Sequence, residues 1–462
     1  MSVPAWVIVG TAILAASPAA RVQSGDANPQ GLFSRHDSVD LTIAAPLQQL
    51  FEKGTNDEHF SVEGTVSIAN VKIPSVQIFV RGNTSKRETE CPFPKLKLKF
   101  PEGRNTGGIF AGLDTVKIGT HCGEAADDEL TKRFGRLANE KSPWREALVY
   151  RLLEAVGMPA LKARPARITY LDTSKGAQGT PLIRNAALIE DDDVAKKRYG
   201  ADAEISMEDF GSARERFGVA DAARLAFAEA MVGNFDWCLK FTPEDTYRCD
   251  QRRPLWNILA LQRGNHVFPL VKDFDIAGIV TGRHPWFGTV FNEAFVPSKS
   301  EIEIEVLSQV QRTRSLFTRQ ALDDARRAFM THRSAAEKAI ADATVDQHGR
   351  ELARKYVRSF YDAIATDAAF YRRVVVRADT RLYTDASKKS EACEPGEAVP
   401  VGTPVNELRR EQSMTEVLIL DVRWRWAPPT NCDAVHTGPV WIESDAIGAD
   451  YPSASRRPAE NH

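Results

Sequence analysis

With 462 residues, of which 43% are hydrophobic and 26% are charged, the chain is long enough to bury a large core. Its formal net charge of −2 gives no strong field of either sign, which disfavours binding to nucleic acid or to an acidic membrane surface. The composition predicts a globular protein of two or three domains.

Residues 1–20 have the features of an export signal. An apolar run from Trp6 to Leu14 is followed by small residues of the kind that signal peptidase accepts, although no Lys or Arg precedes the run. The run is short for a membrane span. We therefore predict a cleaved signal peptide, a flexible linker over 21–37 and a periplasmic or secreted protein without an integral membrane span. The alternatives are an uncleaved anchor or a different start of the chain.

The six cysteines agree with export, because an even number of cysteines outside the cytoplasm favours disulfide bonds. Proximity along the chain suggests the pairs Cys91 with Cys122, Cys238 with Cys249, and Cys393 with Cys432. Many other pairings are compatible with the sequence. A zinc site is the alternative, but no Cys-x-x-Cys or His-x-x-x-His spacing supports it.

A β-rich subdomain is predicted from about Asp40. Short strands are expected near 39–43, 60–68 and 74–80, because apolar and polar residues alternate there. Arg81 comes next and precedes a Gly-Asn turn sequence.

The strand that returns from this turn, near 93–100, carries three lysines in alternation with apolar residues. Lys95, Lys97 and Lys99 therefore share one face of the strand, and the apolar side chains share the other. The lysine face is either the wall of a basic cleft or the solvated face of an edge strand.

Two helices are well marked in the next part of the chain. The first is predicted from Ser142, as N-cap, to Gly157, and the second over Val219–Val232. Between them, strands are predicted near 166–171 and 181–190. The acidic run Asp191–Asp193 is interpreted as a solvated helix start and is left out of the site.

The second helix stops at Gly233-Asn-Phe-Asp-Trp237, which places Asn234 and Asp236 at a junction. Functional polar groups commonly lie at such positions. The alternative is that Gly233 and Asn234 form the helix C-cap, and that Asp236 caps the next element.

A hairpin is then predicted, with strands over 256–261 and 267–273 and a turn at Gly264-Asn265. It carries Asn257 at its start, and it delivers Asp273 and Asp275 at its end. Clustered carboxylates suit a divalent cation. The alternative is an ordinary strand and turn in which Asp275 is a cap.

The rest of the chain is predicted to be helical over 301–376 and β-rich over 377–450. A Gly-x-x-Trp strand at Gly438–Trp441 resembles the closing strand of a small bacterial SH3-like barrel. The tail over 451–462 is predicted to be disordered.

In their order and spacing, these motifs resemble the CotH family of secreted atypical protein kinases, over roughly residues 40–300. The resemblance rests on Arg81-Gly-Asn, the three-lysine strand, the Trp144 to Gly157 helix, Leu188-Ile-Glu190, Gly233–Trp237, Asn257 and Lys272-Asp-Phe-Asp275. A bacterial exported branch is more similar still, through Arg87–Pro94 and Thr120-His-Cys122. The resemblance implies an α+β fold, with a two-lobed kinase-like domain over 38–300, a helical extension over 301–376 and the SH3-like domain over 377–450.

The resemblance also implies roles for single residues. Lys97 would approach nucleotide phosphates, with Lys95 and Lys99 as alternatives, and Asp236 would orient or deprotonate the acceptor hydroxyl. Nucleotide binding would further involve Arg81 and Asn234. The metal ligands of Mg²⁺ or Mn²⁺ would be Asp273, Asp275 and Asn257. This charge neutralisation is what phosphoryl transfer requires.

The resulting hypothesis is an exported, metal-dependent kinase-like enzyme that transfers phosphate from ATP to a hydroxyl of an envelope or secreted protein. The second hypothesis is a kinase-fold envelope protein without catalysis that acts in binding or assembly, because a fold alone does not establish an activity. Both have a protein partner.

Overall fold

The computed structural model describes residues 31–82, 86, 93–101, 108–119, 140–174, 180–240, 254–282, 299–371, 373–394, 398–419 and 439–450. The predicted signal peptide, most of the linker and the C-terminal tail lie outside these ranges. The described end of the linker is held by Arg164, whose guanidinium donates to the carbonyls of Asp37 and Leu32. None of the described helices is both long enough and apolar enough to span a lipid bilayer.

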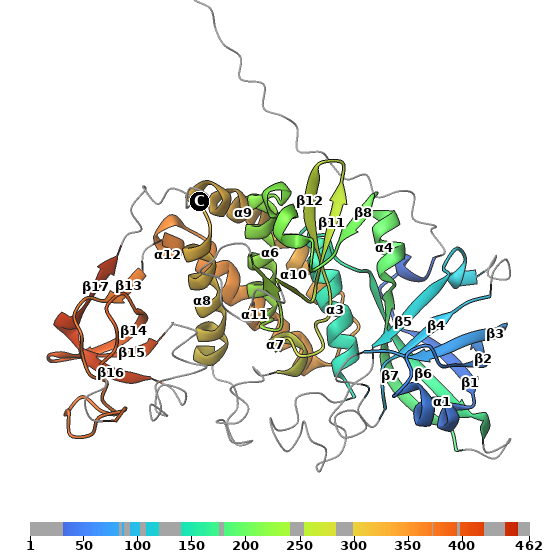
Figure 1. Ribbon diagram of the computed structural model, residues 1–462. Helices are drawn as coiled ribbons and strands as arrows, with labels where there is room; N and C mark the ends of the chain where they lie inside the picture. The colour runs from blue at the N-terminus through green and yellow to red at the C-terminus, as the bar shows by residue number, and fades with distance from the viewer. Residues whose placement is uncertain are drawn as a thin grey trace, which may run out of the picture.

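The fold is a mixture of helices and sheets, and its N-terminal part is a closed seven-stranded barrel (Figure 1). The strands are β1 (Val39–Ala45), β2 (Ser61–Ile68), β3 (Val71–Val80), β4 (Leu96–Lys99), β5 (Thr115–Gly119), β6 (Ala163–Asp172) and β7 (Leu182–Glu190). They are hydrogen-bonded in the order β1-β2-β3-β4-β5-β7-β6, and parallel pairing of β6 with β1 closes the barrel. Apolar side chains such as Ile43, Ile78 and Leu98 fill the interior. Short helices η1 (Leu32–Ser34), α1 (Leu47–Gly54) and η3 (Gly108–Phe110) accompany it.

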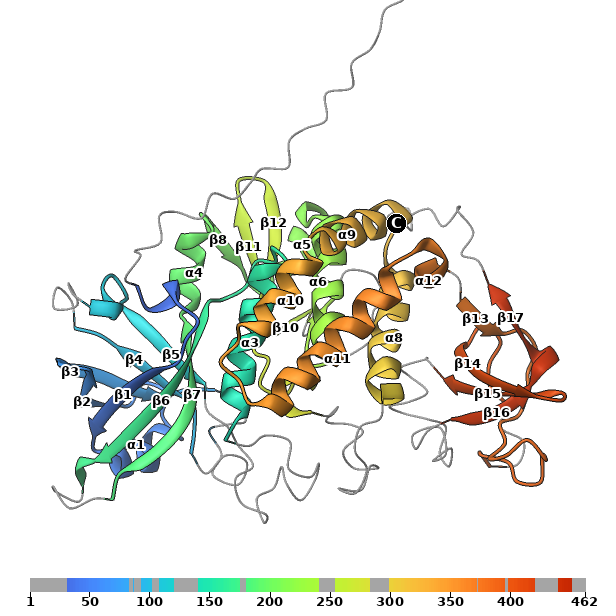
Figure 2. The ribbon, with the colours of Figure 1, turned by 180° about the vertical axis from the view of Figure 1, so that it is seen from behind.

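Helix α3 (Ser142–Ala155) lies between the barrel and the helices of the second part (Figure 2). It begins one residue earlier than predicted, because Lys141 is the N-cap, and it ends before Gly157, which has a left-handed φ of 71°. The buried Arg145 donates to both carboxylate oxygens of Asp346 and to the carbonyl of Val280. This buried ion pair ties α3 to the second part of the molecule.

The second part is mainly helical and has one continuous core, to which residues from 147 to 371 contribute. Its helices are α4 (Asp192–Arg198), α5 (Phe210–Ala213), η5 (Arg214–Arg216), α6 (Val219–Val232), α7 (Gly278–Thr281), α8 (Lys299–Leu316), α9 (Arg319–Thr331), α10 (Arg333–Ala341), α11 (Gln347–Ile364) and α12 (Asp367–Tyr371). The predicted helix over Val219–Val232 is confirmed. Because α8 to α12 share the core of α3 and α6, the predicted helical extension packs as part of this body.

Two small sheets complete the second part. The strands are β8 (Ala203–Ile205), β9 (Cys238–Leu239), β10 (Leu255–Trp256), β11 (Ile258–Arg263) and β12 (His266–Val271). β11 and β12 form the predicted hairpin, which turns at Gly264, and β8 pairs with β11. The open end of this hairpin leads to the candidate site.

The C-terminal part is a five-stranded sheet with a core of its own. Its elements are β13 (Arg373–Val376), β14 (Pro404–Glu411), β15 (Met414–Ile419), β16 (Val440–Glu443), η6 (Ser444–Ala446) and β17 (Ile447–Asp450). The strands are ordered β16-β15-β14-β13-β17. The β-rich texture is confirmed, and the SH3-like identity stays a prediction.

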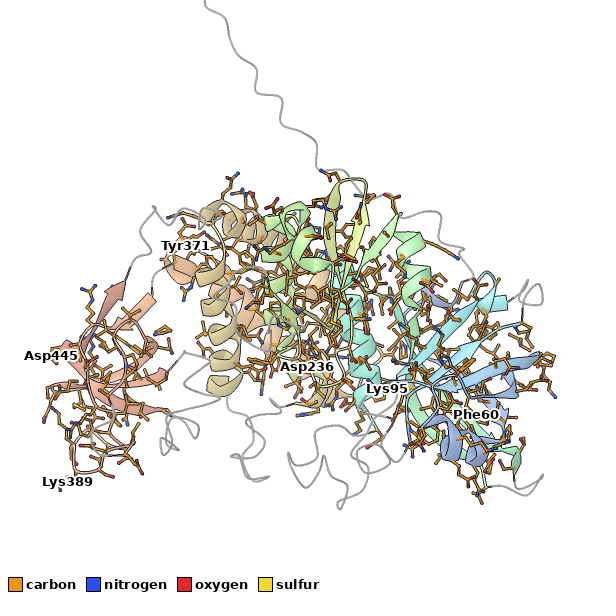
Figure 3. The ribbon with its side chains drawn as sticks, viewed as in Figure 1. Phe60, Lys95, Asp236, Tyr371, Lys389 and Asp445 are labelled. Atoms are coloured by element: carbon orange, nitrogen blue, oxygen red, sulfur yellow. The ribbon has the colours of Figure 1, made fainter. Side chains whose placement is uncertain are left out.

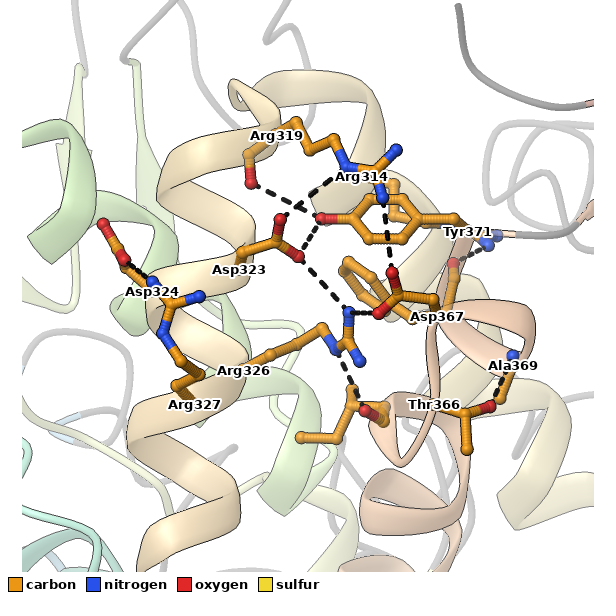
Figure 4. A network of polar contacts seen from close by, with 12 residues as sticks. Arg314, Arg319, Asp323, Asp324, Arg326, Arg327, Thr366, Asp367, Ala369 and Tyr371 are labelled. Atoms are coloured by element: carbon orange, nitrogen blue, oxygen red, sulfur yellow. Dashed lines mark hydrogen bonds and ion pairs between the residues drawn. The ribbon is translucent and has the colours of Figure 1, made fainter. Parts of the chain in front are cut away.

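A polar network fastens α12, the helix that leads into this sheet (Figure 4). Tyr371 donates its hydroxyl hydrogen to Asp323, at 2.6 Å, and its ring lies against the guanidinium of Arg319. Arg326 bridges Asp323 and Asp367. These contacts fix the start of β13 on the helical body.

Two of the six cysteines lie in the described part of the chain. Cys238 and Cys393 are both buried, and neither is a free thiol. Their predicted partners, Cys249 and Cys432, and the predicted pair of Cys91 with Cys122 lie outside the described residues. The pairings therefore stay predictions.

Candidate functional site

Lys95 connects the barrel to the hairpin end. The residue is 5% exposed, and its Nζ lies 2.7 Å from Asp275 Oδ2 and 3.2 Å from Asp273 Oδ1. Burial lowers the pKa of this ammonium, but the two carboxylates outweigh burial and bring the net pKa above its ordinary value. Lys95 therefore remains charged and holds two acidic side chains from the other part of the molecule. Figure 3 labels Lys95 beside the barrel and Asp236 in the helical part.

The alternation of β4 explains why a lysine reaches this position. Leu96 and Leu98 point into the barrel, so the lysine face is turned outward. Lys97 lies on that face but pairs with Asp191 at 3.3 Å, and Lys99 is exposed. The structure brings Lys95, and not Lys97 or Lys99, to Asp273. The resemblance implies Lys97 as the phosphate-binding residue, whereas the lysine that lies beside Asp273 is Lys95.

Asn257 and Asp273 flank the open end of the β11–β12 hairpin. The N–H of Lys272 donates to the carbonyl of Asn257 at 3.2 Å, which places the two ends side by side. Both Asn257 and Asp273 have left-handed backbones, with φ of 55° and 64°. Such conformations cost free energy and occur often at functional sites. The N–H of Asp273 is anchored on the hydroxyl oxygen of Tyr150, at 3.0 Å.

Asp236 lies beside Asn257. The amide of Asn257 donates to the carbonyl of Asp236 at 2.6 Å and to its Oδ2 at 3.0 Å. The indole N–H of Trp256 donates to Oδ1 at 3.2 Å. The structure therefore groups Asp236, Asn257, Asp273 and Asp275 at one junction, together with Lys95. The roles of these residues stay predictions.

Asn234 does not belong to the accessible part of this site. It is fully buried, its Nδ2 donates to Glu229 Oε2, and its Oδ1 accepts the N–H of Asp236. Its carbonyl accepts the indole N–H of Trp237. The side chain of Asn234 shapes the loop that carries Asp236, and its predicted contact with a nucleotide stays a prediction.

Arg81 lies at the barrel end of the site, where its N–H donates to the carbonyl of Lys95 at 2.8 Å. Its charge acts on Lys95 and Asp273. The Nε of Arg81 is buried and has no hydrogen-bond partner among the described residues. A guanidinium with an unused donor is suited to an anionic ligand such as a phosphate.

Asp191 and Asp192, which the sequence analysis left out of the site, lie between the barrel and the helical part. Asp191 caps α4, which confirms the predicted helix start, but it is buried rather than solvated and pairs with Lys97. Asp192 pairs with Lys117 of β5 at 2.6 Å and with Lys272 at 3.3 Å. Because Lys272 directly precedes Asp273, this pair helps to hold the hairpin end against the barrel.

Glu146 is a site residue that the sequence analysis missed. It lies on α3, one turn before Tyr150, and is 2% exposed. Burial raises the pKa of its carboxyl to about 8, with Lys95 opposing the shift and Asp275 adding to it. The available sequence signal was that Glu146 shares a helix face with Val149, Tyr150 and Leu153, which is an unusual place for a charge.

Exchange of Glu146 for glutamine is expected to make stability less dependent on pH. The folded protein holds the Glu146 proton up to pH about 8, whereas the unfolded chain releases it near 4.5. The group's contribution to the free energy of unfolding therefore falls as pH rises through this window. The advantage of Glu146→Gln in thermal midpoint over the wild type should grow from pH 5 to pH 9. Parallel midpoints at both pH values would contradict an uncharged Glu146.

The oxygens around the hairpin end fit a hard divalent cation. Asp273 Oδ2, Asp275 Oδ1 and Asn257 Oδ1 accept no hydrogen bond within the described part of the chain. No cluster of three or more Asp, Glu, His or Cys side chains suited to a metal occurs among the described residues. Two carboxylates and an amide match Mg²⁺, which takes few protein ligands and completes its shell with water and phosphate oxygens.

No protein-family model matches the chain, and no curated protein matches it. Among solved structures, the Helicobacter pylori proinflammatory kinase CtkA is similar at 8% identity and a TM-score of 0.28, with 59% of this chain and 92% of that chain covered. A chain of the Shewanella oneidensis MR-1 toxin–antitoxin complex of HipA, HipB and operator DNA is similar at 10% identity and a TM-score of 0.27, with coverages of 58% and 63%. At these TM-scores the likeness carries no argument, so the interpretation depends on the geometry of the site.

Proposed function

We propose that this protein is a metal-dependent phosphotransferase that uses ATP. The observation that carries the proposal is the meeting of Lys95 from the barrel with Asp273 and Asp275 from the hairpin end, beside the pair of Asn257 and Asp236. Phosphoryl transfer needs cations on the phosphates and a positioned acceptor. This junction provides both kinds of group.

Each residue has a chemical task in this proposal. Lys95 and Arg81 neutralise phosphate oxygens, and Asp273, Asp275 and Asn257 hold Mg²⁺ or Mn²⁺. The metal supplies charge stabilisation on the phosphates. Asp236 orients the acceptor hydroxyl and takes its proton as the oxygen bonds to the γ-phosphorus, while the bond from that phosphorus to the ADP oxygen breaks.

The proposed acceptor is a hydroxyl of an envelope or secreted protein. Export is supported by the apolar run and small residues of 1–20 and by the finding that the buried Cys238 and Cys393 are not free thiols. The C-terminal sheet, which has its own core, is proposed as the module that binds the wall or a protein partner.

A second candidate function is binding or assembly without catalysis. One observation favours it: Lys95, a residue of the chain itself, neutralises Asp273 and Asp275. A protein that had lost catalysis would retain such a cluster, in which the charges neutralise one another, as part of its structure.

Ligand-induced stabilisation separates the two functions. The chain from about residue 25 is heated with ATP and Mg²⁺ or Mn²⁺, and the midpoint is compared with that of Asp273→Asn. A ligand at a hundredfold excess over its Kd stabilises by about 2.7 kcal/mol, so we expect a rise of several degrees in the wild type and none in Asp273→Asn. The exposed Asp379 provides the matched control Asp379→Asn, which should respond like the wild type. An unchanged wild-type midpoint would favour the binding function.

A further inference from the structure

Glu229 is a buried acidic residue that the proposed mechanism does not use. It lies in the last turn of α6, just before the loop that carries Asp236, and the residue is 1% exposed. It makes no ion pair in the described part of the chain. Its Oε1 is buried and has no hydrogen-bond partner among the described residues. A negative charge in such a position would be costly, because no cation and only one donor would compensate for the loss of water.

The surroundings of Glu229 keep a proton on its carboxyl group. Burial raises the pKa of this carboxyl well above its ordinary value, the hydrogen bond from Asn234 opposes the shift, and the negative charge of Asp236 adds to it. The two carboxyl groups beside this loop therefore differ in charge. Glu229 is the uncharged acid, and Asp236 is the carboxylate.

The side-chain amide of Asn234 connects these two residues. Its Nδ2 donates to Glu229 Oε2 at 2.9 Å, and its Oδ1 accepts the N–H of Asp236 at 3.0 Å. The two ends of the amide cannot be exchanged, because Nδ2 would then face the N–H of Asp236, which is also a donor. The Glu229 carboxyl therefore favours the one orientation of the amide in which Oδ1 holds Asp236.

Other contacts of this loop do not involve the Glu229 side chain. The N–H of Asn234 donates to the backbone carbonyl of Glu229 at 3.0 Å, and the carbonyl of Asn234 accepts the indole N–H of Trp237 at 3.1 Å. These contacts remain when the carboxyl group is removed. Loss of the carboxyl is therefore expected to displace Asp236 rather than to unfold the loop.

We propose that Glu229 is a positioning residue, whose carboxyl group orients the amide of Asn234 and thereby places Asp236 for phosphoryl transfer. The inference rests on the role of Asp236 in the proposed function and extends that function to a residue of the helix behind the site. The task requires an uncharged hydrogen-bond acceptor at this position. Glutamine should therefore replace Glu229, whereas an apolar residue of similar size should not.

Steady-state phosphate transfer, measured where all variants are folded, tests the inference. Glu229→Met should lower kcat at least about tenfold and leave the KM for ATP unchanged, because a small displacement of a catalytic group is costly. Glu229→Gln should keep the wild-type kcat, because its amide oxygen can accept from Asn234. A wild-type kcat in Glu229→Met, or equal losses in Glu229→Met and Glu229→Gln, overturns the inference.

Leu225→Ala is the matched control for lost stability. Leu225 is fully buried and lies one turn earlier on the same face of α6, so its truncation should lower the thermal midpoint without removing the partner of Asn234. Its kcat should equal that of the wild type, and a loss as large as that of Glu229→Met overturns the inference. If Glu229→Met does not fold, Glu229→Asp takes its place. The shorter acid withdraws the acceptor from Asn234, so kcat should fall, and a wild-type kcat overturns the inference.

A second readout does not require activity. The indole N–H of Trp256 donates to Asp236 Oδ1 at 3.2 Å, so a fluorine label on this ring reports the position of the carboxylate. The protein is labelled with fluorotryptophan, and the resonance of Trp256 is assigned with Trp256→Phe. Glu229→Met should shift this resonance without nucleotide present, whereas Glu229→Gln and Leu225→Ala should not. An unshifted resonance in a folded Glu229→Met overturns the inference.

The outcomes also distinguish this inference from the proposed function. If the Trp256 resonance responds as expected but the wild type transfers no phosphate, the placement of Asp236 by Glu229 stands and the phosphotransferase proposal is wrong. If the wild type transfers phosphate and Glu229→Met matches it in both kcat and resonance, the inference is wrong and the phosphotransferase proposal stands.

Discussion

Replacement of Asp236 with alanine is expected to lower phosphoryl transfer by a factor on the order of 10² to 10⁴, the usual contribution of a positioned general base. Both carboxylate oxygens of Asp236 are held by donors, Oδ1 by Trp256 and Oδ2 by Asn257. The carboxylate is therefore fixed in orientation before any substrate binds. The donors that hold its two carboxylate oxygens belong to Trp256 and Asn257, not to the proposed phosphate-binding residues Lys95 and Arg81, so nucleotide binding should persist.

Incorporation of labelled phosphate into the protein itself or into an added protein acceptor measures this effect, and nucleotide binding is measured on the same samples. Asp379→Ala, at an exposed position of the C-terminal part, is the control for loss of a carboxylate. Thermal midpoints are compared first, because the truncation leaves the partly buried donors of Trp256 and Asn257 without their acceptor. Undiminished transfer by Asp236→Ala would assign the proton-accepting role to another residue. Loss of both binding and transfer would indicate a structural role.

The parts of the site that the sequence predicts correctly are those with local causes. The α6 helix ends at Gly233 because a glycine tolerates the left-handed φ of 65° that closes a helix. The hairpin follows from two apolar strands around Gly264, and it delivers Asn257 and Asp273 to one end by register alone. These features depend on residues that are close together in the chain.

The choice among the three lysines has no local cause. Alternation puts Lys95, Lys97 and Lys99 on one face, but which of them meets Asp273 depends on how the barrel lies on the helical part. Closure of the barrel also depends on residues that are far apart in the sequence, because it pairs Val39 with Ala166. The periodic pattern of apolar residues, which predicts helices and strands, does not predict such long-range contacts.

Burial explains the remaining differences. Asn234 follows a helix and was expected to be exposed, but its side chain turns inward to Glu229. Glu146 was passed over because the helix was described by its apolar stripe alone, while the structure buries nearly every side of α3. The position of Glu146 on the same helix face as the apolar Val149, Tyr150 and Leu153 is the signal that would have found it.

Exchange of Gly233 for alanine is expected to destabilise the protein by about 2–5 kcal/mol. The left-handed backbone costs about 1–2 kcal/mol for a residue with a side chain. In addition, a Cβ at Gly233 would collide with the ring of Tyr356 and lie 2.6 Å from Glu305 Oε1. Both neighbours belong to the buried interior, and Tyr356 donates its hydroxyl hydrogen to Glu305 Oε2 at 2.6 Å, so neither can move freely. Overpacking of this kind costs about 1–3 kcal/mol more.

Gly200 separates the two causes, because its φ of 61° is close to that of Gly233 but its Cβ would have no atom within 4 Å. Gly200→Ala should therefore lose only the backbone contribution, about 1–2 kcal/mol, and the difference between the two variants in unfolding measures the close approach of Tyr356. Equal losses in the free energy of unfolding would show that α8 and α11 move to accommodate the added methyl group. Since Gly233 begins the loop that Asn234 and Asp236 share, a yielding core would move Asp236. Phosphoryl transfer by Gly233→Ala should then fall below that of Gly200→Ala even at temperatures where both variants are folded.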